Sequence, residues 1–248
     1  METNILKMIT IADIASIANA ICGLLAIFLI LNGNNIASAQ LLLLAVVFDC
    51  IDGTLARKFN THSIGSFGET IDSLADMISF GVAPAIILYM ISNSYWIIIP
   101  SIIIVVCGLL RLTRYNTIIE YQDEPTKTFL GLPIPVTSTL LAALILAGIT
   151  NIYILIILLM IVSILMVSEV KYPKVKNKKI IAIAAIVIIL CIIPHINGIL
   201  YLVPSYLLII GVLIYIFAIL FGNFEATQLN EKRQPTTRQK RPSLYKDE

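Results

Sequence analysis

The chain has 248 residues, of which 58% are hydrophobic and only 13% are charged, and its mean hydropathy is +0.94. A soluble domain would carry about 25% charged residues, so the composition excludes an ordinary soluble protein and indicates that a lipid bilayer surrounds most of the chain. The net charge of +2 says little about partners, and we expect no nucleic acid among them.

Eight apolar runs along the chain are long enough to be candidate membrane helices. They cover residues 9–31, 34–57, 67–91, 94–119, 133–149, 151–169, 179–197 and 199–222. Stretches rich in Asn, Gly, Pro and Ser separate them. The first run lacks a cleavage pattern, so we expect it to be retained. The sequence therefore predicts an all-α, polytopic membrane helical bundle with about eight transmembrane helices.

The basic residues predict the orientation of this bundle. With eight spans, all 17 Lys and Arg residues lie on one side of the membrane, in alternate connections and in the two termini. Because basic residues accumulate on the cytoplasmic side, we expect an integral protein of the cell membrane with both termini in the cytoplasm. We predict a transmembrane domain at 1–222, with a six-helix core at about 8–170 and two scaffold helices at 179–222, and a basic cytoplasmic tail at 223–248.

Four acidic residues interrupt the second and third apolar runs at regular spacing. The two patterns are Asp49-x2-Asp52-Gly53-x2-Ala56-Arg57 and Gly68-x3-Asp72-x3-Asp76. Residues three or four apart share one face of a helix. A carboxylate at the centre of a membrane helix costs about 2.5–3.5 kcal/mol, so four on neighbouring helices indicate a shared counter-charge, most simply metal ions.

The short connection between these two runs predicts an antiparallel helical hairpin. If the chain folds back near His62, Asp52 lies level with Asp72, and Asp49 lies level with Asp76. Four converging carboxylates cannot all ionise without cations. Oxygen ligands favour Mg²⁺ or Mn²⁺, with Ca²⁺ as a further candidate. Two such ions would clamp a diphosphate.

The residues between the acids favour a phosphate-bearing ligand. Gly53 and Gly68 remove side chains where a nucleotide could approach the backbone, and Arg57 is placed to bind a phosphate oxygen. An ion transporter or channel also uses carboxylates within the membrane. That alternative does not account for the fixed positions of Gly53, Ala56, Arg57 and Gly68.

Over residues 8–170 the chain resembles the CDP-alcohol phosphatidyltransferase family, whose motif contains each of these residues. The ten-residue spacer from Lys58 to Phe67 is longer than is usual in that family. The resemblance implies that two divalent cations bind to the four acids, that Asp76 is also the general base, and that a CDP group is held nearby. The implied metal ligands are Asp49, Asp52, Asp72 and Asp76, and the implied CDP contacts are Gly53, Ala56, Arg57 and Gly68.

The first apolar run also resembles the family. Asp13-x2-Ser16-x2-Asn19 is similar to a common Asn-x2-Thr-x2-Asn pattern, from which it departs at Asp13 and at Ser16. The resemblance implies that Ser16 and Asn19 contact the CDP-lipid. The alternative is that both are small polar residues at a helix contact.

Four stretches look like the serine-transferring branch of the family. They are residues 72–76, 79–84, 107–116 and 129–135. The resemblance implies transfer of a phosphatidyl or archaetidyl group from CDP-diacylglycerol or CDP-archaeol to L-serine, with release of CMP. It also implies a homodimer among membrane lipids. The candidate contacts for serine or the lipid phosphate are Arg111, Arg114, Asn116, Lys127 and Pro133.

The residues alone leave the acceptor open. Arg111, Arg114 and Lys127 could equally bind the phosphate of glycerol 3-phosphate or an inositol phosphate, or serve only as anchors on the cytoplasmic side. Serine would also need a partner for its ammonium group, and Glu120, Asp123 and Glu124 are equivalent candidates.

Overall fold

The computed structural model describes residues 5–59, 67–92, 94–120, 128–173, 178–193 and 202–217. The elements in chain order are α1 (Ile5–Met8), α2 (Ile11–Leu31), α3 (Asn35–Phe59), α4 (Phe67–Asp76), η1 (Met77–Val82), α5 (Ala83–Ser92), η2 (Tyr95–Ile97), α6 (Ile98–Glu120), β1 (Thr128–Leu130), α7 (Pro135–Leu146), α8 (Ile152–Val167), β2 (Lys171–Pro173) and α9 (Lys178–Ile192). A last helix covers Leu202–Phe217. The all-α prediction is confirmed, with one small addition described below.

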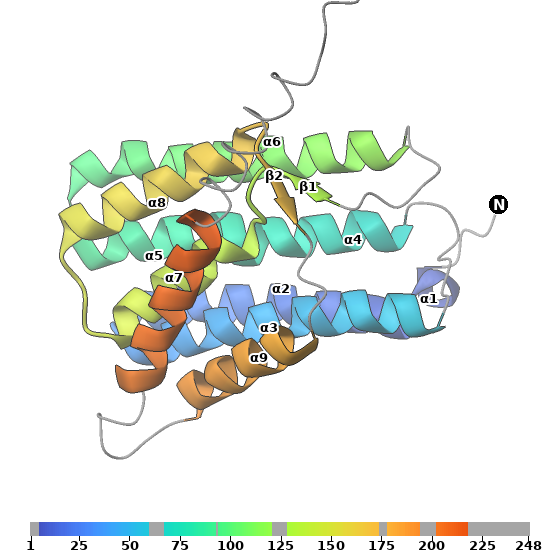
Figure 1. The fold of residues 1–248 in the computed structure, drawn as a ribbon, viewed down its shortest axis with the longest axis horizontal. Coiled ribbons are helices and arrows are strands. Elements are labelled where there is room, and N and C mark those ends of the chain that lie inside the picture. Colours follow the sequence, from blue (N-terminus) through green and yellow to red (C-terminus); the bar gives the residue numbers. More distant parts are fainter. Residues whose placement is uncertain are drawn as a thin grey trace, which may run out of the picture.

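The helices form an elongated bundle (Figure 1). α2 packs along α3 on one side of the bundle, and α6 packs along α8 on the other. The segment formed by α4, η1 and α5 runs between these two pairs and contacts both α2 and α6. α9 packs against α3. α2 therefore contacts both α3 and α4, the two helices that carry the four acids.

Four helical segments of the described chain are long and apolar enough to cross a membrane. They are Ile11–Leu31, Asn35–Lys58, Phe67–Ser92 and Tyr95–Ile118. The other four, α7, α8, α9 and the last helix, contain 10 to 17 residues. Each of the eight predicted apolar runs therefore contains a helix in the part of the chain that the structure describes, while the number of spans and the sidedness of the termini stay predictions.

α7 is the central helix of the bundle. Its residues from Thr137 to Leu146 are all buried, and it contacts α3, α8 and η1. A helix that is apolar on every face is buried on every face, so the uniform composition of α7 fits this central position. Its few hydroxyl groups are consequently available only to neighbouring helices and to its own backbone.

Two short strands join segments that the sequence analysis treated as loops. β1 and β2 pair antiparallel, with Phe129 opposite Tyr172. The chain then turns at Gly131, whose φ is +78°, and the Gly131 N–H donates to the Val170 carbonyl at 2.8 Å. A Cβ at Gly131 would overlap the Met166 carbonyl oxygen and the Arg114 guanidinium, both of which lie well inside van der Waals contact distance. Only glycine fits this turn, because both the φ angle and the space require it.

Candidate active site

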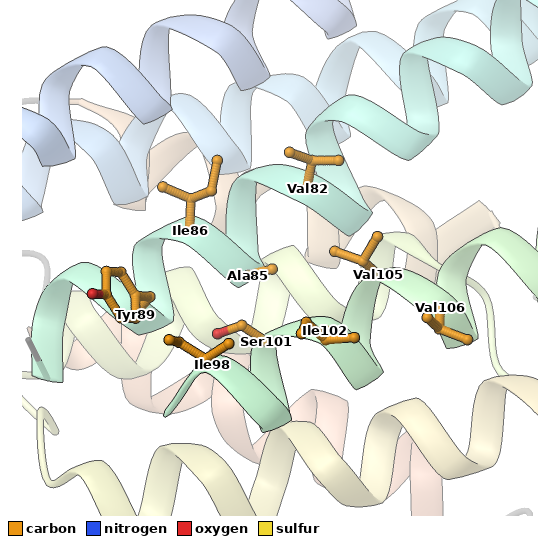
Figure 2. A pocket seen from close by; sticks show the side chains of 9 residues that line it. All are labelled: Val82, Ala85, Ile86, Tyr89, Ile98, Ser101, Ile102, Val105 and Val106. Carbon is orange, nitrogen blue, oxygen red and sulfur yellow. The ribbon is translucent and has the colours of Figure 1, made fainter. Parts of the chain in front are cut away.

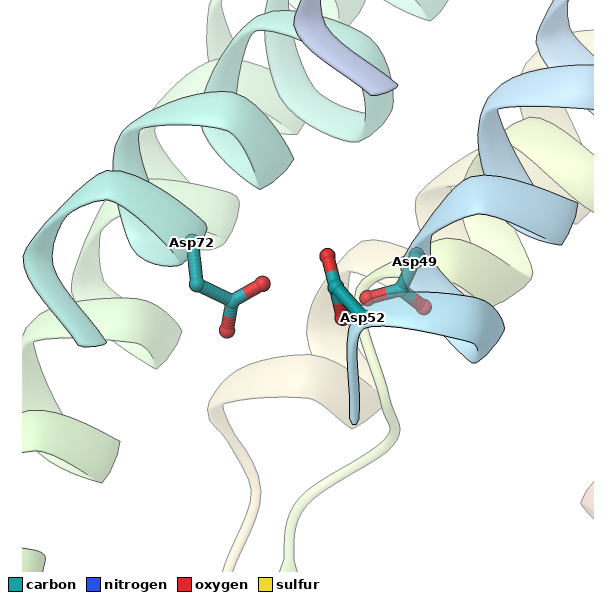
Figure 3. Close-up of side chains that lie close together, drawn as sticks. All are labelled: Asp49, Asp52 and Asp72. Atoms are coloured by element: carbon teal, nitrogen blue, oxygen red, sulfur yellow. The ribbon is translucent and has the colours of Figure 1, made fainter. Parts of the chain in front are cut away.

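Three of the predicted metal ligands meet between α3 and α4. Oxygen atoms of Asp49, Asp52 and Asp72 all lie within 4.8 Å of one another. Figure 3 shows Asp72 on its helix facing the other two across a gap. Asp52 is buried, and Asp49 and Asp72 are half-buried. The predicted register, with Asp52 level with Asp72, agrees with this geometry.

Asp76 completes the cluster one helical turn deeper along α4. It is 6% exposed, and its carboxyl group lies within hydrogen-bonding reach of that of Asp49. Its Oδ1 accepts a hydrogen bond from Asn19 Nδ2 at 3.1 Å. The predicted pairing of Asp49 with Asp76 therefore also agrees with the structure, and the four acids form one continuous group.

α2 supplies the hydrogen-bond donors for this group. The Ser16 hydroxyl donates to Asp52 Oδ2 at 2.8 Å, and Asn19 donates to Asp76. Both polar residues are buried. They therefore orient the acids, a role that the sequence pattern did not predict for them, whereas their predicted contact with a CDP-lipid stays a prediction.

The donor set fits divalent cations. Two acceptor atoms at the site, Asp72 Oδ1 and Asn19 Oδ1, are buried without a hydrogen-bond partner among the described residues. Buried oxygens normally find a partner, and four carboxylates in low dielectric require positive charge. Mg²⁺, Mn²⁺ and Ca²⁺ all prefer such oxygen ligands.

Arg111 provides positive charge from the protein itself. It lies on α6 and is 7% exposed. Its charge acts on Asp49, Asp72 and Asp76, so its guanidinium lies near the acid cluster. The guanidinium carbon also lies 5.4 Å from the centroid of the Tyr115 ring, a distance typical of a cation–π contact.

Arg114 has a different environment, although it lies only three residues further along α6. Nη2 donates to the carbonyls of Leu130 and Met166, each at 2.9 Å, and Nη1 donates to the Val167 carbonyl at 3.0 Å. The guanidinium thus joins α6 to the end of α8 and to the last residue of β1. Arg111 and Arg114, which the sequence suggested together as contacts for serine or the lipid phosphate, therefore have different partners in the structure.

The remaining candidates for the acceptor lie at the edge of the site. The Asn116 amide and the Ser73 hydroxyl bond each other, at 2.9 and 3.2 Å, and so tie α6 to α4 beside Asp72. Pro133 is half-buried just before α7. Lys127 lies outside the described residues, as do Asp123 and Glu124.

The four candidate CDP contacts lie around the end of α3 and the start of α4. Ala56 and Arg57 are exposed, while Gly53 and Gly68 are half-buried. Arg57 Nη2 donates to the Thr54 hydroxyl at 3.4 Å. A Cβ at Gly53 would lie 3.4 Å from Arg57 Nη1, so the open backbone at Gly53 and the Arg57 side chain are neighbours.

Two apolar grooves lie on the outer surface of the bundle. The first, of about 510 Å³, runs between α2 and the α4–η1 segment, and its lining includes Ile71 and Ala75, which precede Asp72 and Asp76 in sequence. The second, of about 340 Å³, lies between α5 and α6 (Figure 2). Of these two grooves, the first therefore lies along the helix that carries Asp72 and Asp76.

Several polar residues near the site make hydrogen bonds that the sequence did not predict. Thr10 and Asp13 form a capping box at the start of α2, in which Asp13 Oδ2 accepts from the Thr10 N–H at 2.7 Å. The spacing Thr-x2-Asp is typical of a capping box, so the sequence could have predicted this helix start. Ser79 and Ser138 gave no comparable signal, because their bonds join separate helices.

A further tyrosine pair lies beyond the six predicted core helices. The rings of Tyr172 on β2 and Tyr215 on the last helix lie 5.8 Å apart, and burial raises the pKa of Tyr172. The charge of Arg111 also acts on Tyr215. The last helix thus approaches the Arg111 side of the site.

The fold and the site define a helical membrane protein with a carboxylate cluster suited to divalent cations. The CDP-alcohol phosphatidyltransferase family model matches residues 9–168, which is more than half of the chain. The chain belongs to the CDP-alcohol phosphatidyltransferase family.

Individual relatives are similar over part of their length. Archaetidylserine synthase of Methanothermobacter thermautotrophicus is 42% identical over 149 residues, which are 59% of this chain and 62% of the relative. CDP-diacylglycerol–serine O-phosphatidyltransferase of Methanocaldococcus jannaschii is 42% identical over 138 residues, 56% and 61% of the two chains. The Bacillus subtilis protein of the same name is 40% identical over 124 residues, 48% and 66%. In each case the match spans less than two thirds of the relative.

Proposed function

We propose that this chain transfers a phosphatidyl or archaetidyl group from a CDP-activated lipid to the hydroxyl of L-serine and releases CMP. The observation that supports the reaction is the convergence of Asp49, Asp52, Asp72 and Asp76 within a domain of this family. The support for serine is the similarity to relatives whose names specify serine or archaetidylserine.

Asp49, Asp52, Asp72 and Asp76 would hold two divalent cations, with Mg²⁺ or Mn²⁺ as the first candidates. Bound cations would neutralise the diphosphate and stabilise the departing CMP. Ser16 and Asn19 keep two of the carboxylates in place for this task. Gly53, Ala56, Arg57 and Gly68 would contact the CDP group, since they lie near the end of α3 and the start of α4, within one or two helical turns of the acids along the chain.

Asp76 is the proposed general base. Asn19 holds one of its oxygens, which fixes the direction in which the carboxylate can take a proton. It would accept the proton of the serine hydroxyl as the serine oxygen bonds to the lipid-proximal phosphorus. The bond from that phosphorus to the CMP oxygen breaks in the same step, and CMP leaves with the electron pair.

Arg111 is the proposed anchor for the serine carboxylate or the lipid phosphate. Its guanidinium already lies near the acids, whereas that of Arg114 is held by three backbone carbonyls. The apolar groove between α2 and α4 would take a hydrocarbon chain of the lipid, because it runs along the two helices that carry part of the site and would bury apolar surface.

The arrangement in the membrane follows the sequence prediction. We propose eight spans in one transmembrane domain, with the site and both termini facing the cytoplasm of the cell membrane, a basic tail at 223–248, and a homodimer.

The test is CMP release by the purified full-length protein with Mn²⁺ or Mg²⁺. CDP-diacylglycerol and CDP-archaeol are each combined with L-serine, glycerol 3-phosphate or an inositol phosphate. Release that requires L-serine supports the proposal. Release with another acceptor overturns the assignment of serine, and no release from folded protein with any pair overturns the transferase reaction.

A further inference from the structure

The helix that carries Asp72 and Asp76 leaves α geometry directly after Asp76. Residues Met77–Val82 form a π turn, in which the Ala83 N–H donates to the Ile78 carbonyl, five residues back. In the same register the Ser79 carbonyl would accept from residue 84. Residue 84 is proline, which has no N–H. The Ser79 carbonyl therefore needs a donor from outside its own helix.

Ser138 on α7 supplies that donor. Its hydroxyl donates to the Ser79 carbonyl at 2.7 Å, and both residues have no exposed surface. A buried carbonyl without a partner is costly. The Ser138 hydroxyl consequently stabilises the π turn in preference to a regular α-helix.

The side chain of Ser79 extends the connection to α2. Its hydroxyl donates to the Asn19 carbonyl at 2.8 Å, and the Asn19 side chain donates to Asp76. A Cβ at Gly23, one turn along α2 from Asn19, would overlap Ser79, so the helices touch closely here. A continuous chain of hydrogen bonds thus leads from α7 through the π turn and α2 to Asp76.

The π turn also sets the direction of the Asp72 and Asp76 side chains relative to α5. It places one extra residue in the helix, and one residue corresponds to about 100° of rotation. α5 is fixed in the core by buried Ala85, Ile87 and Leu88. The direction of Asp76 on α4 therefore depends on whether the turn between α4 and α5 keeps its π register.

We propose that Ser138 and Ser79 are positioning residues that hold Asp76, through the π turn and Asn19, in the orientation that binds the metal ion and accepts the proton. This inference rests on the proposed function, because it assigns a role toward the metal site and base described there. Neither serine touches the reacting groups themselves.

The test compares three variants of the full-length protein. Ser138→Ala removes the donor, and Ser138→Thr keeps a hydroxyl. Ser163→Ala is the matched control, because Ser163 is equally buried but its hydroxyl donates only to the Leu159 carbonyl of its own helix, at 2.8 Å. Mn²⁺ affinity is measured without substrate by electron paramagnetic resonance, and kcat and KM for L-serine are measured in the CMP assay.

We expect Ser138→Ala to weaken Mn²⁺ binding and to lower kcat, each by about 10-fold, the range found for residues that orient metal ligands. KM for L-serine should stay unchanged, because Arg111 is untouched. Ser138→Thr should restore both quantities, and Ser163→Ala should match the wild type. Ser138→Ala that binds Mn²⁺ and turns over like Ser163→Ala overturns the inference, as does Ser138→Thr that is equally impaired.

A second variant tests the same connection if Ser138→Ala does not fold. Ser79→Ala keeps the carbonyl that accepts from Ser138 and removes only the hydroxyl that donates to the Asn19 carbonyl, so this variant should also bind Mn²⁺ more weakly. Wild-type Mn²⁺ affinity in Ser79→Ala would refute the positioning role of Ser79. A wild-type protein that binds no Mn²⁺ gives a different result, since it refutes the metal site of the proposed function itself.

Discussion

Replacing Arg114 by lysine tests whether this arginine is structural or binds the acceptor. Its guanidinium donates to the carbonyls of Leu130, Met166 and Val167 at 2.9 to 3.0 Å. These carbonyls come from two segments far apart in sequence, and a guanidinium can serve them together because its donors diverge in a fixed plane. A lysine ammonium is a single point of charge on a flexible stem, so it cannot reproduce this geometry.

The expected cost follows from the burial of the three bonds. The bonds to Leu130 and Met166 are partly buried, and the bond to Val167 is exposed, so water can replace only the last. Leaving one partly buried carbonyl without a donor costs about 1–3 kcal/mol. If lysine keeps one of the two buried bonds, Arg114→Lys should lower the free energy of unfolding by about 1–3 kcal/mol.

The assay measures the free energy of unfolding in detergent micelles together with KM for L-serine. Arg114→Lys should reduce stability and leave KM for L-serine within about 2-fold of the wild type, because the substituted group lies away from the acids. Arg111→Lys is the contrasting variant and should raise KM for L-serine, since Arg111 lies near the cluster. Arg114→Lys with normal stability and a strongly raised KM would refute the structural role and place Arg114 in the acceptor pocket.

Three further predictions concern single groups. Asp76→Asn should abolish CMP release while the protein stays folded, as judged by circular dichroism, and full activity would remove Asp76 as the base. Gly131→Ala should lower the melting temperature strongly. The φ of +78° alone costs a non-glycine residue about 1–2 kcal/mol, and the Met166 carbonyl blocks the new Cβ. An unchanged melting temperature would contradict this prediction. Thr10→Ala should cost about 1 kcal/mol of unfolding free energy through loss of the cap, with an unaltered value as the contrary result.

The acid cluster could be predicted from the sequence because local rules determine it. Helical spacing puts Asp49 with Asp52, and Asp72 with Asp76, on common faces. The short connection between the two helices then sets their register, and the observed contacts of Asp52 with Asp72 and of Asp49 with Asp76 agree with it. The apolar runs likewise predicted where helices form, since each run contains a helix among the described residues.

The features that the sequence did not predict depend on contacts between segments that are distant along the chain. The sequence suggested Arg111 and Arg114 together as contacts for serine or the lipid phosphate. Arg114 instead donates to carbonyls at the end of α8 and in β1, and no local pattern reveals such partners. Pro84 signals an irregular helix, but a proline does not specify a π turn. That turn depends on a hydroxyl from Ser138, which is 59 residues away.

The charges at the site make it dependent on cations. Four converging carboxylates in low dielectric cannot all ionise without positive charge, and Arg111 supplies one such charge from the protein itself. Under the proposed function divalent cations would supply the rest, and carboxylates already held by Ser16 and Asn19 would bind them with little rearrangement. Preorganisation by α2 is thus as much a part of the site as the acids themselves.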